Sequence, residues 1–163
     1  MKALILFRSH YGNTKQVAEV LAKELGAAGI ESVVEDLRRR LPDLGEFDAV
    51  LVGAPTRMAR VTHRALSVLK RLLKKGWGKK PVAIFDTYGP EPTKPEEIEK
   101  GRKWIIPGAA GLMHQRAKDL GLNVFGKTLR CEVQGMKGPL KDGAVDKAAA
   151  FAKEFAKAIA PKA

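Results

Sequence analysis

The feature that most constrains this chain is a regular alternation between short apolar segments and longer segments with helical spacing. Residues 3–7 and 49–53 contain no polar side chain, which is typical of parallel strands buried on both faces. Between such segments, apolar residues recur every three or four positions, as on one face of a helix. Because strands that alternate with helices pair in parallel through right-handed crossovers, we expect an α/β fold: an open, doubly wound sheet with helices on both faces.

This pattern predicts the individual elements and one domain over residues 1–163. Strands are expected at 3–7, 30–37, 49–53, 81–86 and 128–134, and helices at 14–25, 61–72, 109–120 and 145–159. The second strand carries three acids, which favours a place at the edge of the sheet. Prolines divide the segment from Gly89 to Gly108 into loop and at most a short helix beginning near Pro95. An insert of this kind can form a lid, a substrate pocket or a dimer contact.

The positive charge of the chain is concentrated in one region. The formal net charge is +12, and no acidic residue lies between Asp48 and Asp86. Helix 61–72 therefore has one apolar face and one basic face, with Arg60, Arg64, Arg71 and Lys75 on or beside the basic one. This face either docks an acidic protein or a nucleic acid, or is simply solvated. The basic stretch from Arg57 to Lys80 holds a single aromatic residue, Trp77, and no nucleic-acid-binding motif, which argues against nucleic acid.

Several classes of protein are excluded or disfavoured. The single cysteine, Cys131, excludes an internal disulfide and is expected to be a buried apolar residue. His10, His63 and His114 lack the spacing of metal ligands, so no metal site is expected. No apolar run approaches the roughly 20 residues that cross a bilayer, and the first residues do not form a signal peptide. We therefore expect a cytoplasmic protein without membrane insertion.

Three segments follow predicted strands and are candidates for a ligand site: Arg8 to Thr14, Ala54 to Ala59 and Thr87 to Pro90. In open α/β sheets a ligand binds outside the carboxyl ends of the strands, where the strand order reverses. The segment from Ser9 to Thr14 also opens a helix, so its N–H groups and hydroxyls can converge on a phosphate. It matches neither GxGxxG nor GxxxxGK[ST], which argues against NAD and ATP. Alternatively, its polar side chains merely cap the helix.

These segments carry a resemblance to the flavodoxin family. The first flavodoxin loop follows the pattern [ST]-x-x-G-x-T around the phosphate of flavin mononucleotide (FMN), and Ser9, Gly12 and Thr14 match it. The segment 53–56 resembles the second flavin loop, and the segment 86–89 takes the place of the third. The resemblance implies five parallel strands in the order 2-1-3-4-5 and non-covalent FMN. The cofactor-binding residues that it implies are Ser9, His10, Tyr11, Gly12, Asn13, Thr14, Pro55, Thr56, Arg57, Met58, Thr87, Tyr88 and Gly89.

The resemblance implies electron transfer through the flavin. The chain would act as a small reductase of a quinone-like or other acceptor, with NAD(P)H a possible donor, or as a carrier for an acidic redox protein. Because the flavin supplies the redox chemistry, no residue is expected to be a catalytic acid or base. The alternative is a flavodoxin-like module without flavin that docks an acidic protein or nucleic acid through its basic helix.

Individual site residues keep two interpretations. Tyr88 would stack on the isoalloxazine ring, or is a loop aromatic half buried at the surface. His10 would donate to the phosphate, or faces solvent. Arg57 and Met58 would lie at the edge of the flavin ring. Alternatively, Arg57 is an ordinary residue of the basic surface. Trp104 is expected to pack within the insert.

Three features depart from the small electron carriers of the family. Those carriers are usually acidic, whereas this chain is basic, and its segment after Gly89 is longer. No glycine lies between Gly53 and Gly76, where many carriers have a glycine peptide that turns toward the flavin ring. A non-glycine residue makes positive φ costly, so we expect Arg57 and Met58 to hinder that turn. The missing glycine and the positive charge together predict that the flavin takes up two electrons at closely spaced potentials, with little neutral semiquinone.

Overall fold

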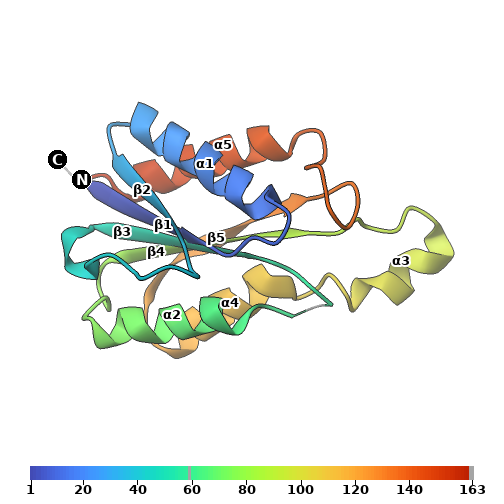
Figure 1. The fold of residues 1–163 in the computed structure, drawn as a ribbon, viewed down its shortest axis with the longest axis horizontal. Helices are drawn as coiled ribbons and strands as arrows, with labels where there is room; N and C mark the ends of the chain where they lie inside the picture. Colours follow the sequence, from blue (N-terminus) through green and yellow to red (C-terminus); the bar gives the residue numbers. More distant parts are fainter. Residues whose placement is uncertain (59, 162–163) are drawn as a thin grey trace.

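The computed structural model describes residues 1–58 and 60–161, and its elements follow the predicted alternation (Figure 1). The strands are β1 (Lys2–Phe7), β2 (Glu31–Asp36), β3 (Ala49–Pro55), β4 (Pro81–Tyr88) and β5 (Asn123–Glu132). The helices are α1 (Asn13–Ala27), α2 (His63–Lys74), α3 (Pro95–Arg102), α4 (Gly108–Asp119) and α5 (Ala144–Ile159). A short 3₁₀ helix, η1 (Leu44–Glu46), precedes β3.

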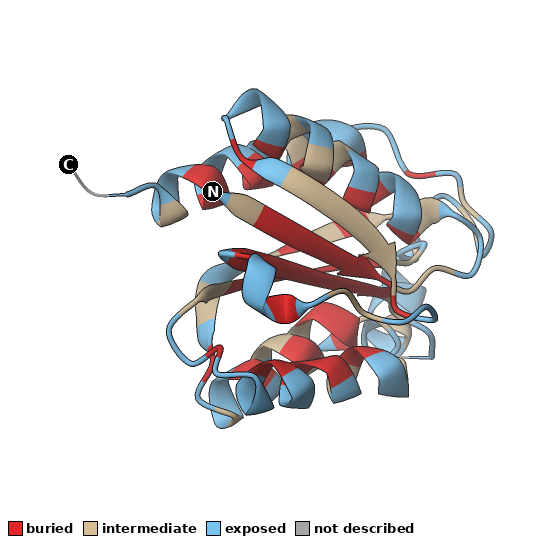
Figure 2. Cartoon of the chain, turned by 60° about the vertical axis from the view of Figure 1, so that its left-hand side comes forward, coloured by how far each residue is buried: buried red, intermediate tan, exposed pale blue. Residues whose placement is uncertain are grey.

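The strands form one parallel sheet in the order β2-β1-β3-β4-β5, which confirms the predicted fold and strand order. Helices α1 and α5 cover one face, and α2 and α4 cover the other (Figure 1). Alternate residues of β1 enter the two cores: Ile5 packs with α1 and α5, whereas Leu4 and Leu6 pack with α2 and α4. Figure 2 shows the central strands buried between helices whose outer faces are exposed. Burial on both faces explains why β1 and β3 read as continuous apolar runs.

The outer strands show where the sequence pattern is weaker. Strand β2 lies at the edge as predicted, because it pairs with β1 alone. The prediction for β5 was wrong at both ends: it begins at Asn123 instead of residue 128 and ends at Glu132 instead of residue 134. Val124 pairs with Val82 but Thr128 pairs with Ile84, so β5 bulges between them and loses its alternation.

The ends of two other elements also differ from the predicted bounds. Strand β4 continues past Asp86 to Tyr88, which carries the polar residues Asp86 and Thr87 within the sheet. Helix α2 begins at His63 instead of residue 61, because the extended backbone of Thr62 (φ −66°, ψ 145°) places it at the N-cap. Both shifts fall at the carboxyl edge of the sheet, where the ligand segments lie.

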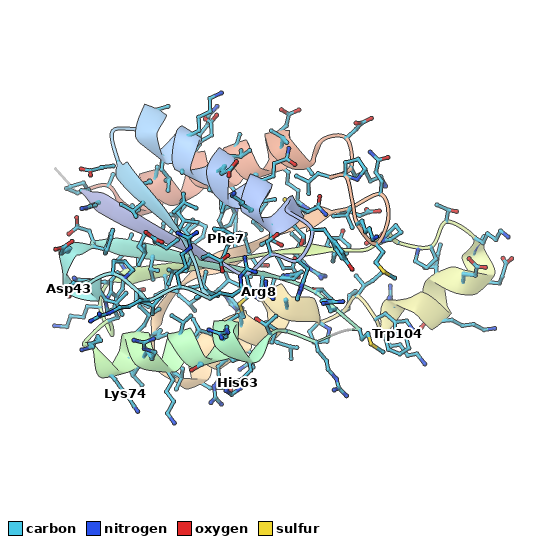
Figure 3. The ribbon with its side chains drawn as sticks, in the orientation of Figure 1. Phe7, Arg8, Asp43, His63, Lys74 and Trp104 are labelled. Carbon is cyan, nitrogen blue, oxygen red and sulfur yellow. The ribbon has the colours of Figure 1, made fainter. Side chains whose placement is uncertain are left out.

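The segment between β4 and α4 contains α3, which begins at Pro95 as predicted. This helix projects away from the sheet (Figure 1), and none of its residues is buried. Trp104 lies beside it (Figure 3) and is 48% exposed, so it does not form a packed interior for the insert. None of the helices in the described residues is long and apolar enough to span a membrane.

Candidate cofactor site

A cleft of about 380 Å³ lies at the carboxyl ends of β1, β3 and β4. Its volume is in the range of small-molecule sites. The predicted residues that line it are Ser9, His10, Tyr11, Asn13, Thr14, Pro55, Thr56, Arg57, Met58, Thr87, Tyr88 and Gly89. Gly12 instead lines an adjoining hollow, which shares Ser9 and His10 with the cleft. The three predicted segments therefore meet at one site.

Three lining residues were not among the predicted cofactor-binding ones: Pro90, which ends the third candidate segment, Val133 and Met136. Val133 and Met136 follow β5, whose end the sequence placed too late. Val133 pairs with Leu140 across a short loop, and this loop brings the exposed Met136 to the cleft. The pairing joins residues close in sequence, and Gly135, Gly138 and Pro139 mark a turn there, but no local signal places this turn beside the cleft.

The loop before α1 is built around a left-handed glycine. Gly12 is the N-cap of α1 with φ 92°, a conformation that favours glycine, and its N–H donates to Ser9 Oγ over 3.0 Å. No side chain caps the helix, so the interpretation of Ser9, Asn13 and Thr14 as N-caps is wrong. The helix N-terminus is left open toward the cleft that Asn13 and Thr14 line.

Several backbone donors of this loop lack protein acceptors. Within the described residues, no hydrogen bond uses the N–H groups of His10, Tyr11, Asn13, Thr14 and Lys15. Adjacent free N–H groups at a helix N-terminus carry partial positive charge and bind anions. The loop thus offers what a phosphate requires.

Two buried hydroxyls lie behind the loop. Thr14 Oγ1 is 2.8 Å from Thr87 Oγ1, and both residues are almost completely buried. One hydroxyl donates to the other, which leaves the proton of the second hydroxyl unused within this pair. Since both residues line the cleft, that proton is available to a ligand.

Thr56 has a structural contact that sequence reasoning missed. Its hydroxyl donates to Asp86 Oδ2 over 2.8 Å and accepts from the N–H of Ala109 over 2.7 Å. The hydroxyl proton is therefore committed to Asp86. Thr56 lines the cleft while tying the end of β3 to β4 and to the start of α4.

Asp86 is the fully buried centre of this network. Arg130 donates from Nε to Oδ1 over 3.0 Å and from a terminal nitrogen to Oδ2 over 3.0 Å, and Ala110 N–H donates to Oδ2 over 3.0 Å. The negative charge of the carboxylate therefore compensates the positive charge of the guanidinium and the partial positive charge at the N-terminus of α4. A side chain at Gly108 (φ 66°) would collide with Arg130, so glycine is required where α4 meets the pair. The acid that ends the apolar run of β4 was the only sequence signal for this network.

Tyr88 is partly buried and supported by the same arginine. The guanidinium carbon of Arg130 lies 4.2 Å from the centroid of the Tyr88 ring, within the range of a cation–π contact. Burial, followed by the charges of Glu91 and Glu132, raises the pKa of Tyr88 to about 12. The phenol is therefore protonated at neutral pH. Because Arg130 covers one face of the ring, a cofactor ring would have to stack on the other.

The loop after β3 forms a tight turn. Arg57 and Arg60 exchange backbone hydrogen bonds of 3.1 and 2.8 Å, and Met58 has φ 50°. Met58 thus adopts the positive φ that is costly for a non-glycine residue, and the paired ends of the turn hold its backbone in that conformation. Ala59, the last residue of this predicted segment, lies outside the described residues.

The sheet order and the position of the cleft define an α/β protein of the flavodoxin-like class. The chain belongs to the flavodoxin family, because a sequence model described as "Flavodoxin domain" matches residues 4–127. An archaeal flavodoxin structure has a TM-score of 0.76 at 20% identity, and the match covers 98% of this chain and 99% of that one. Membership of the family implies a flavin cofactor and a redox role.

Two curated relatives are similar in sequence. Protoporphyrinogen IX dehydrogenase [quinone] from Escherichia coli K12 is 29% identical over 111 residues, which cover 65% of this chain and 61% of that protein. NAD(P)H dehydrogenase (quinone) from Gluconacetobacter diazotrophicus is 28% identical over 87 residues, which cover 40% of this chain and 44% of that protein. The matches thus span less than two thirds of either relative.

Proposed function

We propose that the cleft binds FMN and that the chain is an oxidoreductase which passes electrons through this flavin to a quinone-type acceptor. The observation that carries the proposal is the set of free N–H groups in the loop from His10 to Lys15. An FMN phosphate would satisfy them, whereas a flavin without phosphate would not. FMN is therefore favoured over riboflavin.

The residues of the cleft fit the rest of the cofactor. Ser9 Oγ accepts from Gly12 N–H, so its own proton is free to donate to the phosphate, as is one proton of the Thr14–Thr87 pair. Tyr88 offers one ring face, and Tyr11, which is 45% exposed, offers a second aromatic at the same cleft. When bound, FMN supplies the chemistry that accepts and donates electrons, while the chain supplies binding and electrostatics.

Quinone as the acceptor is supported by two observations. Both curated relatives have a quinone in their names. Met58 and Met136 are exposed apolar side chains that line the cleft, which provides apolar contact for a flat ring. The basic composition is also unlike that of the small acidic carriers, so a reductase fits this chain better.

Reconstitution of the flavin-free protein tests the proposal. The fluorescence of FMN should be quenched on binding, and the protein should then show the absorption spectrum of a bound flavin. Riboflavin should bind far more weakly. The protein reduced with dithionite should then be reoxidised by a neutral naphthoquinone without oxygen. Equal affinity for FMN and riboflavin, or no reoxidation by the quinone, would contradict the corresponding half of the proposal.

A second candidate function rests on α2. Its outer face carries exposed Arg71, Lys74 and Lys75, which would dock an acidic protein with or without flavin. Trp77 is buried, so it is not available to stack on a nucleic-acid base. If this face docks an acidic protein, a variant with all three residues replaced by glutamate should no longer bind a labelled polyglutamate peptide. The affinity of the variant for FMN should stay unchanged. If the unchanged protein and the variant both bind the peptide in a salt-insensitive way, the outer face of α2 is an ordinary solvated surface.

A further inference from the structure

Four arginines meet at the carboxyl edge of β1, β2 and β3. Arg8 follows β1, Arg38 follows β2, Arg57 follows β3, and Arg64 lies in the first turn of α2. Figure 3 labels Arg8 near the centre of the view and His63 below it on α2. The elements are neighbours, since the N–H of Arg8 donates to Gly53 O over 3.0 Å.

The contact between α2 and the end of β2 completes this arrangement. A terminal nitrogen of Arg64 lies 3.5 Å from Leu37 O, and Leu37 N–H donates to Phe7 O over 2.8 Å. Arg64 therefore reaches the strand end beside Arg8. We call Arg8, Arg38, Arg57 and Arg64 the arginine cluster.

One carboxylate, that of Asp36, forms an ion pair with the cluster, and its partner is Arg38. Arg38 binds Asp36 through Nε and through a terminal nitrogen that lies 2.6 Å from Oδ2. Among the described residues, Arg8, Arg57 and Arg64 form no ion pair with a carboxylate. Arg8, Arg57 and Arg64 thus lack a direct ion pair, although Asp36 is within electrostatic range of Arg8 and Glu19 and Glu35 line the adjoining hollow.

The neighbouring groups respond to this excess of positive charge. Burial, then the charges of Arg8, Arg57 and Arg38, lower the pKa of His10. Burial also lowers the pKa of Arg8, and Arg38, Arg64 and Arg57 add to that effect while Asp36 opposes it. Like charges held together cost free energy that a bound anion would recover.

The cluster lies beside the cleft, and one of its members, Arg57, lines it. Arg8, Arg38 and Arg57 are all within electrostatic range of His10. Arg57 and His10 line the cleft, and His10 also lines the adjoining hollow of about 510 Å³ together with Arg38. A ligand ring in the cleft would therefore place a short side chain beside the cluster. Guanidinium groups are suited to an oxyanion at this position, because their donors match its geometry.

We propose that the arginine cluster is an anion subsite which binds a carboxylate or phosphate group on the aromatic acceptor that enters the cleft. The inference rests on the proposed function and narrows its substrate to an anionic quinone-type molecule. Three of its four charges come from outside the loop that would hold the cofactor phosphate: Arg38 follows β2, Arg57 follows β3 and Arg64 lies in α2, whereas Arg8 directly precedes that loop and donates to Ser9 O.

A matched pair of ligands tests the subsite. The ligands are a naphthoquinone with a propanoate side chain and its methyl ester, which keeps the ring and loses the charge. Calorimetric titration into the oxidised, FMN-loaded protein at low salt should give about tenfold tighter binding of the acid, as for one charge-assisted hydrogen bond. Added salt should reduce this ratio, since exposed charges are screened.

Variants assign the effect to the cluster. Arg8→Gln with Arg64→Gln should move the ratio of the two affinities toward one and leave ester binding within twofold, because the ester has no charge. Arg71→Gln is the matched control, as it removes the same charge from the same helix roughly 10 Å along its axis. This control should keep the full preference for the acid.

The outcomes separate the subsite from the proposed function. Equal affinity of the acid and the ester for the unchanged protein overturns the subsite. A double variant that loses FMN affinity but keeps the preference also overturns it, since the arginines would then serve the cofactor.

Reoxidation of the dithionite-reduced protein is scored separately. Each quinone takes up two electrons and two protons to become the hydroquinone, and the reduced flavin gives up the same number of each. If neither quinone reoxidises the protein, the proposed function is wrong, while the binding ratio still decides the subsite.

Discussion

The hydroxyls of Thr14 and Thr87 are hydrogen-bonded over 2.8 Å and join the loop before α1 to the end of β4. A phosphate at the loop would draw the free proton of the pair toward itself. Thr14 would then donate to the phosphate and accept from Thr87. This orientation makes Thr14 a ligand and Thr87 a positioning residue.

Replacement of Thr14 by valine is therefore expected to weaken FMN binding. The loss should be about 1.5–3 kcal/mol, the value of a hydrogen bond to a charged group. Thr87→Val should cost less, because it removes only the donor that orients Thr14. Fluorescence titration of the flavin-free variants with FMN measures both effects.

Riboflavin provides the control for this prediction. It lacks the phosphate, so neither variant should change its affinity by more than about twofold. Thr14→Ser should bind FMN like the unchanged protein, since it keeps the hydroxyl. Equal losses for riboflavin and FMN would show that Thr14 does not contact the phosphate.

The ion pair of Asp86 and Arg130 is expected to be important for stability. Asp86→Ala leaves a mostly buried guanidinium without its partner and the N–H of Ala110 in α4 without its acceptor. Breaking such a pair costs about 3–5 kcal/mol. Asp86→Asn keeps an acceptor for Ala110 N–H, so its free energy of unfolding should fall less. Urea unfolding of the two variants measures this difference. Similar stability of Asp86→Ala and the unchanged protein would rule out this role.

The fold was predictable because burial on both faces makes β1 and β3 continuous apolar runs. The strand order, however, came from a resemblance, since apolar runs do not specify their neighbours. The bounds of β5 failed for a physical reason: the bulge opposite Val82 and Ile84 interrupts its alternation. A pattern rule cannot locate a bulge that depends on the pairing of two strands.

The candidate site was predicted unevenly for similar reasons. Residues of the three loops could be found because each follows its strand directly. Arg130 could not be found, because its partner Asp86 is 44 residues away and the pair is formed only by strand pairing. Val133 and Met136 reach the cleft through a short loop closed by the pairing of Val133 with Leu140, and the sequence shows such a turn without showing what it lies against. The sequence thus identified the residues at the strand ends but not the side-chain contacts that form between strands.

His10 is expected to titrate below the usual value for histidine. Its pKa is lowered by burial and by Arg8, Arg57 and Arg38, so the ring is neutral at neutral pH. Because the unfolded state binds the proton at higher pH, this group should make stability rise as pH increases up to about 6.5 and contribute no further change above it. Arg8→Gln should raise the pKa of His10 in an NMR titration, and Arg71→Gln should leave it unchanged. A lower or unaltered value in Arg8→Gln would be inconsistent with the proximity of these charges.

Backbone strain at Met58 can be measured with two substitutions. The side chain is 75% exposed, so its burial contributes little to stability, whereas its φ of 50° is unfavourable for a non-glycine residue. Met58→Gly should be at least as stable as the unchanged protein, and Met58→Val should be less stable by about 1 kcal/mol or more. Thermal unfolding of the flavin-free proteins compares them. Equal stability of the two variants would mean that the turn is unstrained in solution.

The last prediction concerns the two reduction potentials of the bound flavin. Arg57, Arg60 and Arg64 surround the turn, and positive charge favours the addition of negative charge to a nearby ring to an extent set by distance and screening. Met58 holds its left-handed conformation in a turn closed by two backbone hydrogen bonds, so the turn resists the peptide rotation that accompanies one-electron reduction in the family's carriers. We therefore expect the second electron to enter at a potential close to that of the first, which suits the two-electron reduction of a quinone. An anaerobic potentiometric titration measures the separation, and Met58→Gly should widen it by making the rotation easier. Widely separated potentials in the unchanged protein, with no response to Met58→Gly, would favour a one-electron carrier instead.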